Sequence, residues 1–110
     1  MSQSPMAEIQ RYPFSKDALN DLRDNAFAAG NWPLVYVLSD EKHGRAYIGE
    51  TTDTLTRMST HLKHDEKQLL TAVHLITSEY FNKSATLDVE SLLIKYMAAD
   101  GKYTLLNGNL

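Results

Sequence analysis

Two short apolar runs with a polar loop between them dominate the middle of the sequence. Residues 34–38 read Leu-Val-Tyr-Val-Leu and follow Pro33, and this β-branched and aromatic composition favours a buried strand. Residues 40–44 are polar and end in glycine, as hairpin loops do, and residues 45–49 then read Arg-Ala-Tyr-Ile-Gly. The pattern predicts a β-hairpin in which each strand carries one tyrosine.

Capping residues and apolar periodicity predict three helices outside this hairpin. Each is preceded by Ser, Thr or Asp, and the first and third are followed by glycine. The predicted ranges are residues 16–29, 54–64 and 87–100. Residues 72–80 have the composition of a third strand, and a helix there is the alternative. We therefore expect an α+β fold: a small three-stranded, mainly antiparallel sheet flanked by helices, with an extra N-terminal helix.

The chain divides into a short polar beginning and one folded unit. Residues 1–12 show little periodicity and are expected to form a flexible leader. Residues 13–110 are expected to form a single domain with its core at about 32–109. The length of 110 residues suits one compact domain, and the 43% hydrophobic and 23% charged residues are typical of a globular protein.

Composition also excludes several classes of protein. The chain has no cysteine, so it has neither disulfides nor a thiolate zinc site. No apolar run reaches membrane-span length and no secretory signal is visible, which predicts an intracellular, cytoplasmic protein with no membrane partner. The net charge is −3, with 11 Lys and Arg against 14 Asp and Glu, so the chain alone should bind nucleic acid weakly.

The helix predicted over residues 54–64 carries two stripes when its residues are placed about 100° apart. One stripe is apolar and should pack on the sheet: Leu55, Met58 and Leu62. The other contains only arginine and histidine: Arg57, His61 and His64. Taken alone, this polar stripe is explained by a solvated helix face. The functional alternative is a phosphate site, because arginine binds phosphate through paired hydrogen bonds and histidine moves protons near neutral pH.

Glu90 is the anomaly of the helix predicted over residues 87–100. The expected solvent arc of that helix contains Asp88, Ser91 and Lys95. Glu90 instead falls in the apolar arc, among Leu87, Ile94 and Met97. A carboxylate buried without a partner is strongly destabilising or becomes neutral through a pKa shift. A metal ion, a structural pair with an arginine, or a partly exposed helix edge would each account for Glu90, and it is the best candidate for a hard-metal ligand.

The two hairpin tyrosines have an ordinary explanation as aromatic residues on a sheet face. Leu34-Val35-Tyr36 followed by Tyr47-Ile48-Gly49 nevertheless resembles the paired motif of the GIY-YIG nuclease superfamily, and the spacing of the two tyrosines fits that family. The resemblance covers about residues 32–109. Four further positions fall where the family has an arginine, a histidine or tyrosine, a metal-binding glutamate and an asparagine: Arg57, His61, Glu90 and Asn107.

Two positions depart from the family pattern. The first motif reads Leu-Val-Tyr rather than Gly-Ile-Tyr, and the tyrosine that carries the chemistry is retained. Glu50 follows the second motif, where many relatives have a small or basic residue. An extra carboxylate would repel a phosphate there unless it points away or helps to hold a metal ion.

The resemblance implies a divalent-metal-dependent endonuclease that hydrolyses DNA phosphodiester bonds, with one Mg²⁺ or Mn²⁺ and no small-molecule cofactor. Glu90 would hold the metal, and one tyrosine would activate the attacking water, with its own proton drawn by His61 or by metal-bound solvent. The sequence does not say which tyrosine. The implied catalytic residues are Tyr36, Tyr47, Arg57, His61 and Glu90. The expected substrate-binding residues are Gly49, Thr51, His64 and Asn107.

An alternative reading keeps the fold and changes the activity. The acidic balance and Glu50 favour a catalytically weak or inactive module that binds nucleic acid or regulates a partner, whereas the set of five catalytic positions favours an enzyme. Domains of this superfamily commonly act when fused to another domain. We therefore expect a fused or separate DNA-recognition or ATPase domain as partner, such as a C-terminal helicase-like ATPase.

Overall fold

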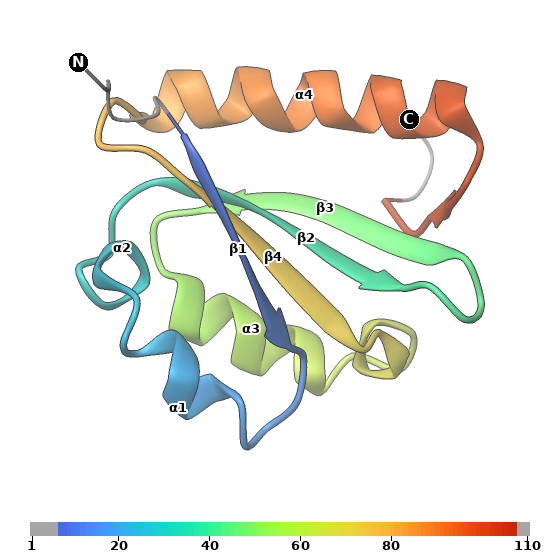
Figure 1. Ribbon diagram of the computed structural model, residues 1–110, viewed down its shortest axis with the longest axis horizontal. Coiled ribbons are helices and arrows are strands. Elements are labelled where there is room, and N and C mark those ends of the chain that lie inside the picture. The colour runs from blue at the N-terminus through green and yellow to red at the C-terminus, as the bar shows by residue number, and fades with distance from the viewer. Residues whose placement is uncertain (1–6, 108–110) are drawn as a thin grey trace, which may run out of the picture.

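The computed structural model describes residues 7–107, which form a five-stranded sheet with helices on both faces (Figure 1). The strand order is β1-β4-β2-β3-β5. The strands are β1 (Glu8–Pro13), β2 (Leu34–Asp40), β3 (Arg45–Thr51), β4 (Ala72–Thr77) and β5 (Thr104–Leu105). The helices are α1 (Leu19–Leu22), α2 (Ala26–Ala29), α3 (Thr54–Leu62) and α4 (Lys83–Asp100), with a 3₁₀ turn η1 (Lys67–Leu69). The expected α+β class is confirmed, but the sheet has five strands rather than three.

The central hairpin has the predicted position and fixes the register of the two tyrosines. Strands β2 and β3 pair antiparallel, with Tyr36 opposite Gly49 and Leu38 opposite Tyr47. Gly44 closes the loop with φ 63°, a left-handed conformation that glycine adopts without steric cost. Because side chains alternate along a strand, Tyr36 and Tyr47 lie on one face of the sheet, and Glu50 lies on the other.

Both edge strands were missed by the sequence analysis. Residues 8–12, expected to belong to a flexible leader, lie in β1, which pairs antiparallel with β4. Only Tyr12 of β1 is partly buried, so this strand lacks the alternation of apolar residues that marks a strand in sequence. Strand β5 has two residues, which is too short for any periodicity. Residues 1–6 and 108–110 fall outside the described part of the chain.

The helix expected over residues 16–29 is two short helices. The Asn25 side chain accepts hydrogen bonds from the backbone N–H groups of Phe27 (3.0 Å) and Ala28 (3.3 Å), and this cap starts α2 anew. Its Nδ2 donates to Gln10 of β1 over 2.7 Å, which ties the break between α1 and α2 to the edge strand. Local sequence patterns do not reveal a partner so far away in the chain, and one continuous helix was therefore expected.

The later elements agree more closely with the sequence. Residues 72–77 form a strand rather than a helix, and α3 ends at Leu62. Helix α4 begins at Lys83, four residues earlier than expected, because Asn82 rather than Thr86 caps it through a 2.8 Å hydrogen bond from Ala85 N–H. Gly101 ends α4 in a left-handed conformation with φ 74°, as predicted.

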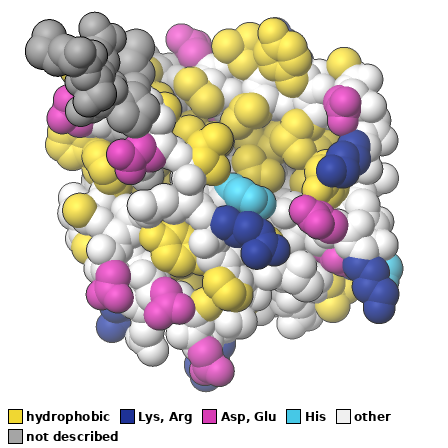
Figure 2. Space-filling view, in the orientation of Figure 1, with side chains coloured by type: hydrophobic (Ala, Val, Ile, Leu, Met, Phe, Trp, Pro, Cys, Tyr) yellow, Lys and Arg dark blue, Asp and Glu magenta, His cyan; other side chains and the backbone are white. Residues whose placement is uncertain are grey.

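The hydrophobic core lies between the sheet and helices α1 to α3, whereas α4 lies along the opposite face of the sheet (Figure 1). Met58 of α3 is fully buried in this core, and Leu55 and Leu62 pack against it, as the apolar stripe predicted. Helix α4 is less well covered. Three members of its apolar arc are exposed, namely Leu87, Leu92 and Tyr96. Apolar side chains gather over the upper part of the face seen in Figure 2, where α4 lies. No helix within residues 7–107 combines the length and the apolarity that crossing a bilayer requires.

Candidate active site

Tyr36 and His61 form a buried pair between the sheet and α3. The Tyr36 hydroxyl lies 2.7 Å from His61 Nε2, and the exposed fractions of the two residues are 1% and 3%. Burial is the main cause of a raised Tyr36 pKa, and it lowers the pKa of His61 to about 4, with further lowering by the positive charges of Lys67 and Arg57. At neutral pH the phenol therefore keeps its proton and the imidazole is uncharged. With the imidazole proton on Nδ1, the hydroxyl donates this hydrogen bond to Nε2.

Tyr47 lies beside this pair and is only partly buried. Its ring centroid is 6.3 Å from that of Tyr36 and 5.1 Å from that of His61. The Lys67 ammonium lies 4.0 Å from the Tyr47 centroid, within the range of a cation–π contact. The three aromatic rings thus contact one another on the α3 side of the sheet, and the cation contacts the Tyr47 ring. The functional grouping of the two tyrosines with His61 is a prediction that this geometry supports.

The position of the Tyr36 side chain explains why residue 49 is a glycine. The two residues are direct partners across β2 and β3, and the Tyr36 phenol lies over the Gly49 backbone. A Cβ added at Gly49 would collide with the hydroxyl and ring carbons of Tyr36. The glycine of the second motif is therefore needed to seat the tyrosine of the first motif. This packing role can be read from the structure alone, and substrate binding by Gly49 stays a prediction.

Arg57 lies on the exposed side of α3 and lines a pocket of about 290 Å³ at the start of that helix. Lys83 lines the same pocket from the first turn of α4. The remaining wall contains threonine hydroxyls and one acid: Thr51, Thr52, Thr56, Thr60 and Asp53. Within this wall, Thr51 Oγ1 accepts a 2.9 Å hydrogen bond from Asp53 N–H and orders the turn between β3 and α3. Two cations and several hydroxyls in one pocket suit an anionic ligand.

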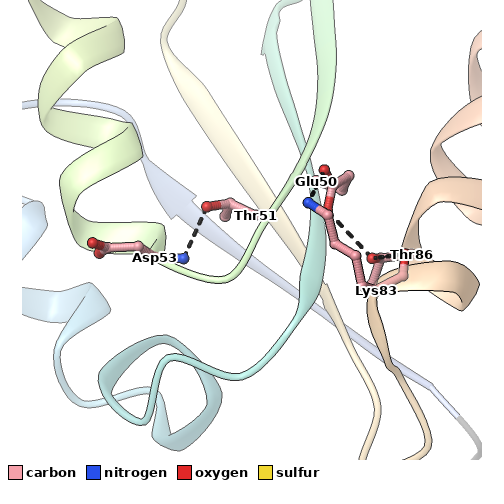
Figure 3. A network of polar contacts seen from close by, with 5 residues as sticks. All are labelled: Glu50, Thr51, Asp53, Lys83 and Thr86. Atoms are coloured by element: carbon pink, nitrogen blue, oxygen red, sulfur yellow. Dashed lines mark hydrogen bonds and ion pairs between the residues drawn. The ribbon is translucent and has the colours of Figure 1, made fainter.

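Glu50 lies on the opposite side of the sheet and is held by α4. Lys83 Nζ donates to both carboxylate oxygens, over 2.6 and 2.8 Å, and Thr86 Oγ1 donates over 3.3 Å (Figure 3). The Glu50 side chain is 11% exposed. The carboxylate thus points away from the tyrosine cluster and is paired with a cation, which removes the repulsion that the sequence departure suggested.

Glu90 is half-buried on α4, and Leu87, one of its predicted apolar neighbours, is exposed. This position also fits the partly exposed helix edge, which was one of the alternatives from the sequence. Burial and the negative charge of Glu50 raise the pKa of Glu90, while a hydrogen bond from the Glu50 backbone and the charge of Lys83 oppose that shift. The charges of Arg57 and Glu90 both act on the Tyr36 pKa, so Glu90 lies within electrostatic reach of the tyrosine cluster. An arginine partner, one alternative from the sequence, is not seen among residues 7–107.

The residues around Glu90 suit a metal ion that is held partly by substrate and water. Within the described chain, no three His, Cys, Asp or Glu residues converge as a complete metal cage. Mg²⁺ in phosphoryl chemistry is commonly bound by one or two carboxylates plus phosphate oxygens and water. Glu90 supplies one such carboxylate close to the negative charge of Glu50, and a cation would offset the repulsion between them. The donor set therefore fits a single divalent cation.

Two predicted substrate-binding residues make structural contacts. Asn107 accepts a hydrogen bond from Ile48 N–H over 3.1 Å and donates from Nδ2 to Ile48 O over 2.7 Å, which fixes the chain after β5 to the edge of β3. His64 lies beyond the end of α3, and its Nδ1 accepts from the N–H groups of Glu66 (3.2 Å) and Lys67 (3.3 Å). Their contacts with substrate remain predictions.

Residues 33–103 match the sequence model described as the GIY-YIG catalytic domain, which covers more than half of the chain. The chain belongs to the GIY-YIG family. This is a nuclease family, so the resemblance found in the sequence is confirmed at that level. No curated protein and no solved structure matches the chain significantly.

This GIY-YIG domain contains two site residues that the sequence analysis did not select. Lys67 reaches Tyr47 from η1, and Lys83 reaches Glu50 and the Arg57 pocket from the start of α4. Neither lies on a predicted helix, so no helical periodicity linked them to the other residues. Lys67 follows His64 by three residues, which was the only sequence signal for it. That spacing places Lys67 beside Tyr47 only because the chain folds into a turn between α3 and β4.

Proposed function

We propose that this domain is a divalent-metal-dependent endonuclease that hydrolyses phosphodiester bonds in DNA. The observation that supports it best is the arrangement of groups around the edge of β3. The tyrosine and histidine side chains lie on one side, Glu90 lies on the other, and the Arg57 pocket lies at the end of the strand. Among residues 7–107, β5 pairs with β3 only at Arg45 and Ala46, so no described strand covers the later residues of β3 on that edge.

Each side chain has a task that its surroundings suit. The Arg57 guanidinium binds nonbridging phosphate oxygens and offsets the charge that develops there during hydrolysis. Glu90 holds the Mg²⁺ or Mn²⁺ ion, which supplies charge stabilisation for the scissile phosphate when it is bound.

The two tyrosines have different roles in this proposal because they differ in burial. Tyr36 is buried and has a raised pKa, so it acts as a hydrogen-bond donor that fixes the His61 ring. Tyr47 is the less buried of the two, and its hydroxyl is the one that orients the attacking water. His61 is uncharged at neutral pH because its pKa is about 4, so it serves as an acceptor within this network.

A nicking assay on supercoiled plasmid with Mg²⁺ or Mn²⁺ tests the proposal. Arg57→Ala and Glu90→Gln should each lower the cleavage rate by about 10²-fold or more, in the range seen when an electrostatic catalytic group is removed. Arg23→Ala and Glu79→Gln change exposed residues that have no assigned role in the site and serve as matched controls. Cleavage that survives both site substitutions would show that a contaminant or another site is responsible.

The competing function is a binding or regulatory module with the same fold. It predicts no cleavage by any form of the chain and no Mn²⁺ binding by calorimetry. Binding of Mn²⁺ by the wild type that Glu90→Gln weakens would support the enzyme even if the right DNA substrate had not been found.

A further inference from the structure

Arg57 and Lys67 form no ion pair in the described part of the chain, although the charge of Glu66 acts on Lys67. Within residues 7–107, the ion pairs join Asp40 to His43 and Arg45, and Glu50 to Lys83. Neither Arg57 nor Lys67 takes part. The whole chain has 14 acidic residues against 11 Lys and Arg, so a shortage of carboxylates does not explain the absence of a partner. Lys67 lies against the ring of Tyr47, and Arg57 lines the pocket at the start of α3.

Their positive charges oppose one another in the ligand-free protein. Burial and the nearby charge of Arg57 lower the pKa of Lys67. Both cations, together with His64, also lower the pKa of His61. A protein surface that gathers like charges in this way stabilises a bound anion, because the anion relieves the repulsion.

Lys67 is placed on Tyr47 by a specific backbone turn. His64 Nδ1 accepts hydrogen bonds from the N–H groups of Glu66 and Lys67, and His64 O accepts one from Gln68 N–H over 3.0 Å. These bonds order the turn that joins α3 to η1 and hold the Lys67 backbone. The ammonium group then lies 4.0 Å from the Tyr47 ring centroid while the residue remains partly exposed.

We propose that Lys67 is a second phosphate-binding cation of this site, which contacts the DNA backbone beside Tyr47, and that His64 positions it by capping η1. The inference rests on the proposed function for its ligand, a nucleic acid backbone. The Arg57 pocket lies at the start of α3. Lys67 would supply a second cation beyond the other end of that helix, next to Tyr47. A purely structural cation–π contact is the competing explanation for Lys67.

Binding of a short fluorescent DNA duplex, followed by anisotropy in EDTA at several salt concentrations, separates these explanations. Lys67→Met should weaken binding several-fold and reduce the slope of log K against log salt by about one, as the loss of one phosphate contact does. Lys67→Arg should keep the slope. Lys42→Met, on the exposed hairpin loop, removes the same charge elsewhere and should change neither quantity appreciably.

The role of His64 is tested by a double-mutant cycle. His64→Ala should weaken binding, His64→Asn should restore part of it because its side-chain oxygen can cap the turn, and His64→Ala should add little once Lys67 is Met. An unchanged affinity and slope in Lys67→Met, or an equal loss in Lys42→Met, would overturn the proposal. Because no cleavage takes place in EDTA, this result is independent of whether the chain proves to be an active nuclease.

Discussion

The Tyr36 hydroxyl and His61 Nε2 are hydrogen-bonded over 2.7 Å in a part of the molecule that solvent barely reaches. The bond joins the middle of β2 to the last turn of α3, so the helix that carries Arg57 is fixed to the sheet through the active-site cluster itself. The proposed catalytic roles of these residues are therefore coupled to their structural role, and only some variants separate the two.

The two tyrosines should respond differently to the same substitution. Tyr36→Phe leaves His61 Nε2 buried without a donor, which should lower the free energy of unfolding by about 1–3 kcal/mol. Tyr47→Phe should change stability less and slow cleavage more, by about 10²-fold or greater, because it removes the hydroxyl assigned to water. Urea unfolding and plasmid nicking measure the two effects. Near wild-type cleavage by Tyr47→Phe would refute the division of roles.

His61 should make stability depend on pH in mildly acidic solution. Its pKa is about 4 in the folded protein and near 6.5 when unfolded, so between these values the unfolded chain binds a proton that the folded chain excludes. The free energy of unfolding should therefore rise as pH increases from about 4 to about 6.5, by an amount on the order of 3 kcal/mol.

Urea unfolding of wild type and His61→Gln across this range isolates that effect. Glutamine can still accept the Tyr36 hydrogen bond but does not titrate, so the wild-type slope should be steeper. His74 also has a lowered pKa, and it contributes equally to both proteins. Parallel pH profiles for the two proteins would contradict the assignment to His61.

Gly49→Ala should destabilise the folded protein through its contact with one residue, Tyr36. The added methyl group collides with the Tyr36 phenol, and overpacking of this kind costs about 1–3 kcal/mol. In a Tyr36→Ala background the obstacle is gone, so Gly49→Ala should there cost much less, whereas a Tyr36→Phe background should give no relief because ring carbons also collide. An equal cost of Gly49→Ala in all three backgrounds would place its effect elsewhere.

Glu50 and Lys83 should have opposite effects on metal binding. Lys83 neutralises Glu50, whose charge acts on Glu90. Removing that cation with Lys83→Met leaves two carboxylate charges for a divalent ion and should tighten Mn²⁺ binding at mildly alkaline pH. Glu50→Gln removes one negative charge and should weaken it. Calorimetric titration measures both, and effects of the same sign would exclude a cation shared electrostatically by Glu50 and Glu90.

The sequence predicted the parts of this molecule that depend on local pattern. The hairpin, α3 and the end of α4 follow from strand composition, helix periodicity and Gly101, and the helix wheel identified Glu90 from its neighbours. Strand β1 could not be found in this way, because an edge strand with exposed side chains needs no alternation. The break at Asn25 depends on Gln10, fifteen residues away in sequence.

The same limit applies to the site. Periodicity grouped Arg57, His61 and His64 in one stripe, but the fold gives each a different environment. His61 is buried against Tyr36, Arg57 lines an open pocket, and His64 caps a turn beyond the helix. The contact of Lys67 with Tyr47 depends on that turn. Residue types and spacing identified the family, while the individual roles require tertiary contacts.

The attachment of Asn107 to Ile48 has a consequence for the behaviour of the protein in concentrated solution. Asn107 and β5 together cover the chain from Gly44 to Ile48 along the outer edge of β3. Thr104 N–H donates to Gly44 O, and Leu106 N–H donates to Ala46 O. An unprotected edge strand recruits strands from other molecules and promotes aggregation. In the described part of the chain, the remaining edge of β3 runs from Gly49 to Thr51, which is too short to template such pairing. The domain can keep a reactive edge accessible to a ligand and still resist self-association through it.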